Sequence, residues 1–216
     1  MVSPPAWLAF VLVGADSLAG AGEWLRAAGF GLILPLGLIV FTVFTGSWLV
    51  AGEEERSMLG LLLATPLRRR RLIFEKYAVL VLLALIPAAG IWLTLSLACW
   101  AGWLPMSWAA LTKASAVLFL MGLAFGALAM ALGCLTGKRW LSFGVMLFYA
   151  LLALLVSRLP GSFPAQPVLR FVSPFYYYDS ALLSYLYGVH AFVLALFAAA
   201  GLILAWAAFE NRDLPA

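Results

Sequence analysis

The sequence predicts an all-α membrane protein, a polytopic helix bundle with five transmembrane spans. Two observations carry this prediction. Hydrophobic residues make up 66% of the 216 residues and charged residues only 10%, and the mean hydropathy is +1.08. A soluble domain of this size needs far more surface charge to stay dispersed. In addition, apolar runs of about 20 residues, the length that crosses the hydrocarbon core as a helix, recur along the chain.

Residues 1–30 are predicted to be an outer-face interfacial segment. The apolar run 5–14 is too short to span a bilayer, and it lacks the basic residues that begin a signal peptide. Residues 6–26 are therefore interpreted as an amphipathic stretch at the membrane surface. Residues 31–216 then form the transmembrane domain.

The five predicted spans are 31–51, 77–101, 111–135, 141–157 and 188–209. Their central parts contain no acidic or basic side chain, and His190 lies only near the outer end of the last one. Proton pumps, ion-coupled carriers and voltage sensors need charge inside the membrane. We therefore expect that any transport draws its energy from a partner, and that a hydrophobic or amphipathic substrate is favoured over a small ion.

The basic residues give the orientation. One side of the predicted membrane carries Arg56, Arg68, Arg69, Arg70, Arg71, Lys76, Lys138, Arg139 and Arg212, and the other carries Arg26, Lys113, Arg158 and Arg170. By the positive-inside rule the connection 52–76 and the C-terminus are cytoplasmic, and the N-terminus is outside. The residues predicted to anchor in lipid headgroups or the cytoplasm are Arg68, Arg69, Arg70, Arg71, Lys76, Lys138 and Arg139. Because the basic residues cluster at the ends of spans, nucleic acid is not an expected partner.

The third span is predicted to pack closely against another helix. It carries small residues at four- and seven-residue intervals, at Gly122, Gly126, Gly133 and Gly137. Such residues let helices approach in lipid, either within one chain or across a dimer face.

The outer connection 158–187 is rich in proline and tyrosine. Its tyrosines are Tyr176, Tyr177, Tyr178, Tyr185 and Tyr187, which fit an aromatic belt at the membrane interface.

No catalytic constellation is found, so the chain is predicted not to be an enzyme and to hold no cofactor or metal itself. It has a single histidine and no Cys-x-x-Cys pair, which leaves no metal-ligand set. It has neither Gly-x-Ser-x-Gly nor the P-loop sequence Gly-x-x-x-x-Gly-Lys-[Ser/Thr].

The connection 52–76 is predicted to be a cytoplasmic amphipathic helix at which a soluble partner docks. Three carboxylates occupy the first turn, where they complement the helix dipole, four apolar residues follow at helical spacing, and a proline ends the helix. The predicted docking residues are Glu53, Glu54, Glu55, Met58, Leu59, Leu62, Leu63 and Pro66. The alternative is a solvated loop that faces the lipid and has no partner.

The same region resembles the signature of type-2 ABC transporter permeases. In that family a span ends in Ala-Gly-Glu-Glu-Glu and is followed by Gly-Thr-Leu-Glu-Leu-Leu-Leu-Ala-Thr-Pro, a basic patch and a lysine. The matching residues are Ala51, Gly52, Glu53, Glu54, Glu55, Leu59, Leu61, Leu62, Leu63, Ala64, Thr65, Pro66 and Lys76. Ser57 and Gly60 replace the usual glycine and glutamate, so the partner contact is expected to be altered. The segments 173–175 and 209–214 are similar as well.

The resemblance implies a coupling helix that seats on a separate ABC ATPase subunit, which binds the ATP. It also implies a second permease subunit, as a homo- or heterodimer, in a multi-pass exporter of the prokaryotic plasma membrane. The family usually has six spans, so we expect the first to be missing, either because the true start lies upstream or because the subunit is natively short. A membrane scaffold that recruits a different soluble protein through the same helix is the alternative function.

Overall fold

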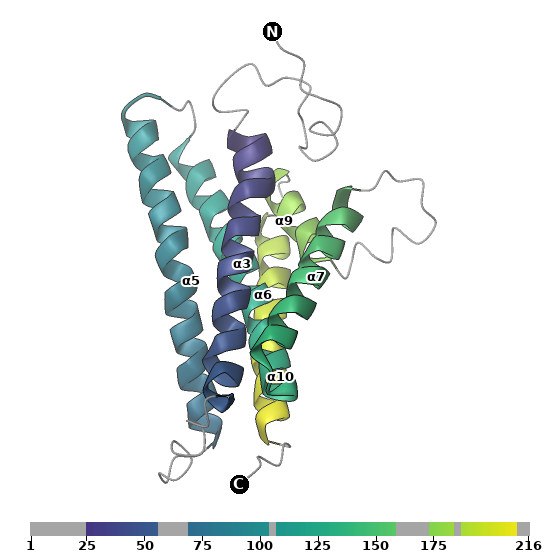
Figure 1. The fold of residues 1–216 in the computed structure, drawn as a ribbon. Helices are drawn as coiled ribbons and strands as arrows, with labels where there is room; N and C mark the ends of the chain where they lie inside the picture. The colour runs from purple at the N-terminus through teal and green to yellow at the C-terminus, as the bar shows by residue number, and fades with distance from the viewer. Residues whose placement is uncertain (1–24, 56–68, 104–106, 159–172, 184–186, 211–216) are drawn as a thin grey trace.

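The computed structural model describes residues 25–55, 69–103, 107–158, 173–183 and 187–210 (Figure 1). The regular elements of this described part are all helical, which confirms the all-α prediction. In order they are η2 (Leu25–Ile33), α3 (Leu34–Ser47), η3 (Trp48–Gly52), α5 (Arg69–Trp100), α6 (Trp108–Thr136), α7 (Arg139–Arg158), α9 (Pro174–Leu183) and α10 (Tyr187–Glu210).

Five helical segments of the described chain are long and apolar enough to cross a membrane, as the sequence predicts. They are Gly29–Gly52, Arg70–Trp100, Trp108–Thr136, Arg139–Ser157 and Gly188–Glu210. Four of them include a whole predicted span and continue past it by one to three residues at one or both ends. Arg70–Trp100 begins seven residues before the predicted start at 77 and ends one residue before the predicted end at 101. The extensions occur because the helical hydrogen bonding continues past the purely apolar run into the first polar and aromatic residues.

The first span changes its helix type along its length. A π-helical segment, η2, leads into α3, and a second one, η3, follows it. Pro35 stands in the first turn of α3, where its missing N–H group and its ring are accommodated by the wider turn before it. Within α3 the hydroxyl groups of Thr42 and Ser47 donate to the carbonyl oxygens four residues earlier, at 2.9 and 2.8 Å. These bonds satisfy polar groups that face the interior of the bundle.

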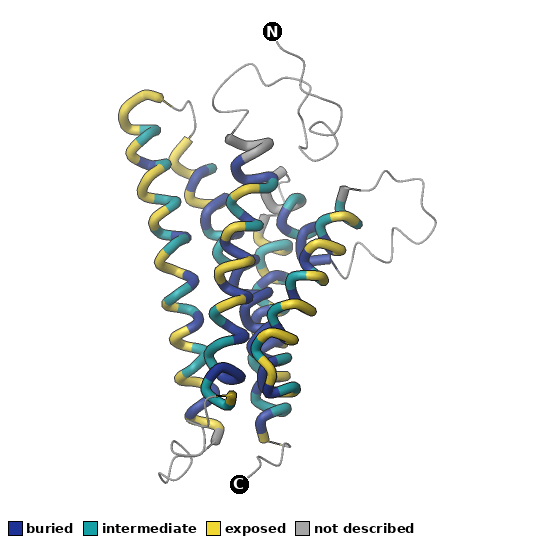
Figure 2. The backbone as a smooth tube through the Cα atoms, viewed as in Figure 1, coloured by how far each residue is buried: buried dark blue, intermediate teal, exposed yellow. Residues whose placement is uncertain are grey.

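Helix α6 is the centre of the bundle. Of an apolar stretch of 18 residues in α6, 78% are buried, against 17% of such a stretch in α5 at the edge of the bundle (Figures 1 and 2). Phe125 lies at the middle of the core, with its ring centroid 5.8 Å from that of Tyr149 on α7 and 5.9 Å from that of Phe175 on α9. The main core therefore joins α3, α6, α7, α9 and α10.

Glycines let α3 approach the backbone of α6. A Cβ atom at Gly46 would overlap the carbonyl oxygen of Gly126 and lie 3.0 Å from its carbonyl carbon. A Cβ atom at Gly122 would lie 2.8 Å from the Leu38 side chain, and one at Gly133 would lie 3.5 Å from the Cβ atom of Ala51. Three of the four glycines predicted to serve helix packing thus contact the first span of the same chain.

The fourth predicted packing glycine, Gly137, has a different role in the fold. It follows the last residue of α6 and takes a left-handed conformation with φ of 66°, which glycine adopts without steric cost. Its N–H group donates to the carbonyl oxygen of Gly133 at 2.9 Å. Gly137 therefore ends α6 and starts the tight turn into α7.

The predicted outer connection contains a helix that the sequence analysis did not foresee. Helix α9 packs against α6, α7 and α10 near the end of the bundle at which η2 begins (Figure 1). Tyr178 is fully buried and donates its hydroxyl to the carbonyl oxygen of Phe30 at 2.7 Å, while Ser173 donates to the carbonyl oxygen of Ala153 at 3.0 Å. The expectation that Tyr178 belongs to an interfacial belt is wrong, because its ring fills the core.

Most of the predicted interfacial segment 1–30 lies outside the described residues, which begin at 25. From Leu25 onward the chain is helical and leads directly into the first span.

Candidate functional site

The charged side chains of the described chain gather mainly at one end of the bundle. At this end η3 leads into the connection 52–76, α5 and α7 begin, and α6 and α10 end (Figure 1). The residues that form the polar end are Glu53, Glu54, Glu55, Arg70, Arg71, Glu75, Lys76, Lys138, Arg139 and Glu210. This end is the one that the charge distribution predicts to be cytoplasmic.

Only part of the predicted docking segment is described. Glu53 and Glu54 continue the helical backbone after η3, and Glu55 forms a turn. The predicted docking residues that lie outside the described residues are Met58, Leu59, Leu62, Leu63 and Pro66. The predicted anchor Arg68 also lies outside them, and Arg69 is described only as the first residue of α5.

The first carboxylate of the acidic motif is bound within the chain. Lys76, in the second turn of α5, donates from its Nζ atom to Oε1 of Glu53. Both side chains are largely buried, at 19% and 27% exposure, so water and salt screen this ion pair less than one on the open surface. The pair ties the end of η3 to the start of α5.

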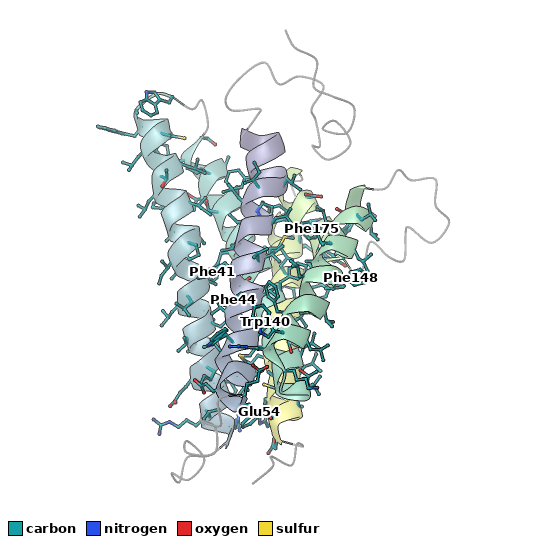
Figure 3. The ribbon with its side chains drawn as sticks, viewed as in Figure 1. Phe41, Phe44, Glu54, Trp140, Phe148 and Phe175 are labelled. Atoms are coloured by element: carbon teal, nitrogen blue, oxygen red, sulfur yellow. The ribbon has the colours of Figure 1, made fainter. Side chains whose placement is uncertain are left out.

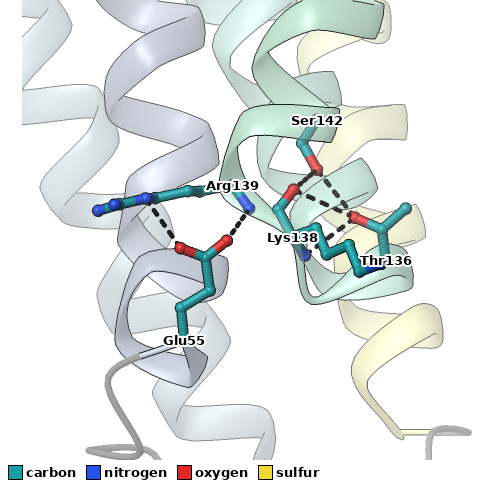
Figure 4. A network of polar contacts seen from close by, with 5 residues as sticks. All are labelled: Glu55, Thr136, Lys138, Arg139 and Ser142. Carbon is teal, nitrogen blue, oxygen red and sulfur yellow. Dashed lines mark hydrogen bonds and ion pairs between the residues drawn. The ribbon is translucent and has the colours of Figure 1, made fainter.

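The third carboxylate reaches a different helix. Oε1 of Glu55 accepts the backbone N–H of Arg139, the first residue of α7, at 2.9 Å (Figure 4). Its Oε2 lies 2.8 Å from Nε of Arg139 in an ion pair. A carboxylate at this position satisfies a backbone donor that has no partner inside the helix, and it lies at the positive end of the helix dipole.

The guanidinium group of Arg139 is also held by aromatic rings. Its Cζ atom lies 4.2 Å from the ring centroid of Trp48 on η3 and 5.6 Å from that of Trp140, which are cation–π distances. Together these contacts hold the Arg139 side chain, at the start of α7, against the end of the first span.

A small recess opens beside this arginine, between α3 and α7. It is lined by Phe44, Ser47, Trp48, Arg139, Trp140 and Phe143. The rings of Phe44 and Phe143 meet edge to face with centroids 6.1 Å apart, and Trp140 and Phe143 meet in the same way. Figure 3 shows Phe44 and Trp140 close together on this side of the bundle. The recess therefore combines apolar rings with a single guanidinium group.

The turn between α6 and α7 is fixed by a hydroxyl network. Oγ1 of Thr136 donates to the carbonyl oxygen of Leu132 at 2.8 Å and lies 3.0 Å from Oγ of Ser142 (Figure 4). The backbone N–H and the hydroxyl group of Ser142 both lie within hydrogen-bond distance of the Lys138 carbonyl oxygen, at 3.1 and 3.0 Å. The start of α7 is therefore rigidly connected to the end of α6.

Two other predicted anchors also contact side chains of the same chain. The guanidinium group of Arg70 lies 5.3 Å from the ring centroid of Trp206 and 5.6 Å from that of Phe74. Arg71 forms an exposed ion pair with Glu75 at 2.7 Å. Contact with lipid headgroups stays a prediction for all of the anchors.

Sequence reasoning missed that two anchors and two docking carboxylates pair with each other. The signal was present, because Glu53, Glu55, Lys76 and Arg139 all lie at the same ends of their spans. Opposite charges at the same depth of a membrane bundle are expected to pair where the helices meet. What the sequence does not give is which helices are neighbours.

No three His, Cys, Asp or Glu side chains of the described residues lie together as a metal-binding group.

Five candidate spans, with a layer of ion pairs at one end, define the class of a polytopic membrane protein. Residues 1–156 match the family model described as ABC-2 family transporter protein, and the chain belongs to this family. No curated protein matches the chain. Membership in this family makes the chain a membrane permease component of an ABC transporter. The partners of such a component are an ABC ATPase and the lipid bilayer.

Proposed function

We propose that this chain is the transmembrane subunit of an ATP-driven exporter, and that the segment 53–66 docks on its ATPase. The observation that carries the proposal is the position of Glu53, Glu54 and Glu55 at the end of the first span, in a chain that belongs to the ABC-2 family. Glu53 to Glu55 stand where the first span leaves the bundle, at the end that holds most of the charged residues. A soluble subunit that binds there has direct access to one end of each of the five described spans.

The orientation of the proposal follows from charge. By the positive-inside rule we infer that the polar end, and with it the C-terminus, is cytoplasmic. The resemblance to type-2 permeases favours the plasma membrane of a prokaryotic cell. ATP is bound on the partner subunit, and a second permease subunit completes the membrane part. Closure of the ATPase pair pulls on the segment 53–66 and tilts the spans around a path between the two permeases.

A hydrophobic or amphipathic substrate is favoured by the lining of the helices. The central parts of the spans carry no acidic or basic group, and the recess between α3 and α7 is built mainly from aromatic rings. Such a surface offers dispersion contacts and one cationic group, and it offers no ligand set for a metal ion.

The test is isolation of the tagged chain from its native membrane. We expect an ATP-hydrolysing subunit to co-purify, and we expect Leu59→Asp combined with Leu62→Asp to release it, because charge opposes burial of an apolar docking face. Leu135→Asp combined with Leu141→Asp is the matched control, since it places the same two charges on exposed leucines at the same end of the bundle.

The ion pairs restrict which substitutions are informative. Reversing Glu53 or Glu55 breaks contacts within the chain, so loss of the ATPase from those variants does not isolate docking. Retention of the ATPase by the double aspartate variant contradicts the docking proposal. A stable complex with a protein that hydrolyses no ATP supports the scaffold alternative.

A further inference from the structure

We propose that Arg139 is a positioning residue that links the docking segment to α7, so that movement of the segment displaces α7 during transport. This inference rests on the proposed function, because it assigns the route by which docking reaches one of the spans. The described range 25–55 ends at Glu55, which belongs to the predicted docking segment. Its carboxylate is bound to Arg139, the first residue of α7.

The link has two parts on Glu55 and a third on the preceding helix. One carboxylate oxygen accepts the backbone N–H of Arg139, and the other faces its Nε atom. The guanidinium group also lies over the ring of Trp48, in the same region of chain as Glu55. Residues 48–55 thus hold both the backbone and the side chain of Arg139. A displacement of Glu55 is resisted at both places.

Helix α7 needs such a link more than α3 and α5 do. Helix α3 leads through η3 into the docking segment, and α5 follows the segment directly and is also joined to it by the Glu53–Lys76 pair. Helix α7 begins 84 residues after Glu55 in the chain. Its connection to the segment is therefore made through space, and Arg139 supplies both the ion pair and the backbone hydrogen bond.

The start of α7 is built to transmit a pull. The Thr136–Ser142 contact and the two contacts from Ser142 to the Lys138 carbonyl oxygen stiffen the first turn. A force on Arg139 therefore moves the helix as a body, and the first turn does not unwind. Because Trp140 and Phe143 belong to this end of α7, its displacement changes the recess shared with Phe44 and Trp48.

The link itself is tested on the chain alone in lipid nanodiscs. Spin labels on Glu54→Cys and Val145→Cys, with Cys99 and Cys134 replaced, report the distance between the start of the segment and α7. We expect one narrow distance distribution in the parent protein and a broadened one after Arg139→Gln. Arg71→Gln is the matched control, because it removes the same charge from an exposed pair that joins two residues of one helix.

Further variants separate a specific link from general damage. Glu55→Gln should broaden the same distribution. Adding it to Arg139→Gln should cause no further change, because both substitutions remove the same Glu55–Arg139 ion pair. Arg139→Lys should give an intermediate width, since it keeps the charge but loses the planar group over Trp48. An unchanged narrow distribution in Arg139→Gln overturns the inference.

Transmission is tested on the complex with its ATPase. Labels at Val40 on α3 and Val145 on α7, both on exposed positions, are compared without nucleotide and with ATP and vanadate. We expect the nucleotide-dependent shift in distance to be lost in Arg139→Gln while ATPase binding and ATP hydrolysis remain. A full shift in this variant overturns the inference.

The two arms distinguish this inference from the proposed function. If no ATPase accompanies the parent protein, the proposed function fails and the role of Arg139 in ATP-driven movement falls with it. If the ATPase binds and the shift persists in Arg139→Gln, only the role of Arg139 fails.

Discussion

Replacing Gly201 by alanine should push α10 away from α6 and destabilise the bundle. A Cβ atom at Gly201 would lie 2.7 Å from the Cβ atom of Ala127, 2.8 Å from its carbonyl carbon and 2.9 Å from the backbone nitrogen of Leu128. These atoms belong to the backbone of α6 or are attached directly to it. No rotamer change relieves the overlap, so the two helices have to separate.

The magnitude follows from the size of that overlap. Ordinary contact of a Cβ atom begins at 3.4 Å, so the shortest distance must grow by 0.7 Å, the difference between 3.4 and 2.7 Å. A gap of roughly 0.5–1 Å already forfeits a quarter to a half of the attraction between packed atoms. Overpacking of this kind costs about 1–3 kcal/mol. Because a backbone cannot move away locally, we expect the upper half, about 2–3 kcal/mol.

The assay is thermal unfolding of the purified protein in detergent, and unfolding is measured as the fraction of monodisperse protein that is lost at each temperature. For a chain of this length about 2–3 kcal/mol corresponds to a midpoint lowered by about 4–12 °C. Gly188→Ala, on the same helix, and Gly90→Ala, inside α5, are the controls, since a Cβ atom at either meets nothing within 4 Å. A Gly201→Ala midpoint no lower than those of the controls would refute the close packing of α10 on α6.

Three more predictions use the same unfolding assay. Gly46→Ala should be at least as destabilising as Gly201→Ala, because its Cβ atom overlaps a carbonyl oxygen of α6, whereas Gly37→Ala on the same helix meets open space; equal midpoints would contradict this. Tyr178→Phe should cost about 1 kcal/mol by removing the buried hydrogen bond to the carbonyl oxygen of Phe30, and a cost near zero would mean that water replaces the hydroxyl. Glu55→Gln and Arg139→Gln should couple by about 1 kcal/mol in a double-mutant cycle, and additive effects would deny the ion pair.

The membrane architecture was predictable because it depends on local composition. A helix in lipid satisfies its backbone hydrogen bonds within its own segment, so an apolar run of sufficient length specifies a span without reference to the rest of the chain. The five predicted runs are therefore five helical segments here, with bounds that differ from the predicted ones by seven residues at most. Helix α9 escaped prediction because its ten residues are too few for that argument, and its position depends on contacts with α6 and α10.

The candidate site was predictable in its residue types and not in its pairing. The charge pattern indicates that Glu53, Glu55, Lys76 and Arg139 lie at one end of the bundle. The structure shows that Glu53 meets Lys76 and that Glu55 meets Arg139. Two carboxylates that were predicted to dock on a partner are thus already bound within the chain. Docking and internal pairing share the same motif.

The sequence by itself determined the class of protein, the number of candidate spans and the segment at which a partner is expected. Those properties follow from hydropathy, charge placement and a local motif, each of which can be evaluated residue by residue. Only the tertiary structure decided which helices are neighbours, and hence that α3 packs against Gly126 and that Glu55 binds Arg139. The physical reason is that apolar helices in lipid have no preferred partner by hydrophobicity alone, so shape and ion pairing select their contacts.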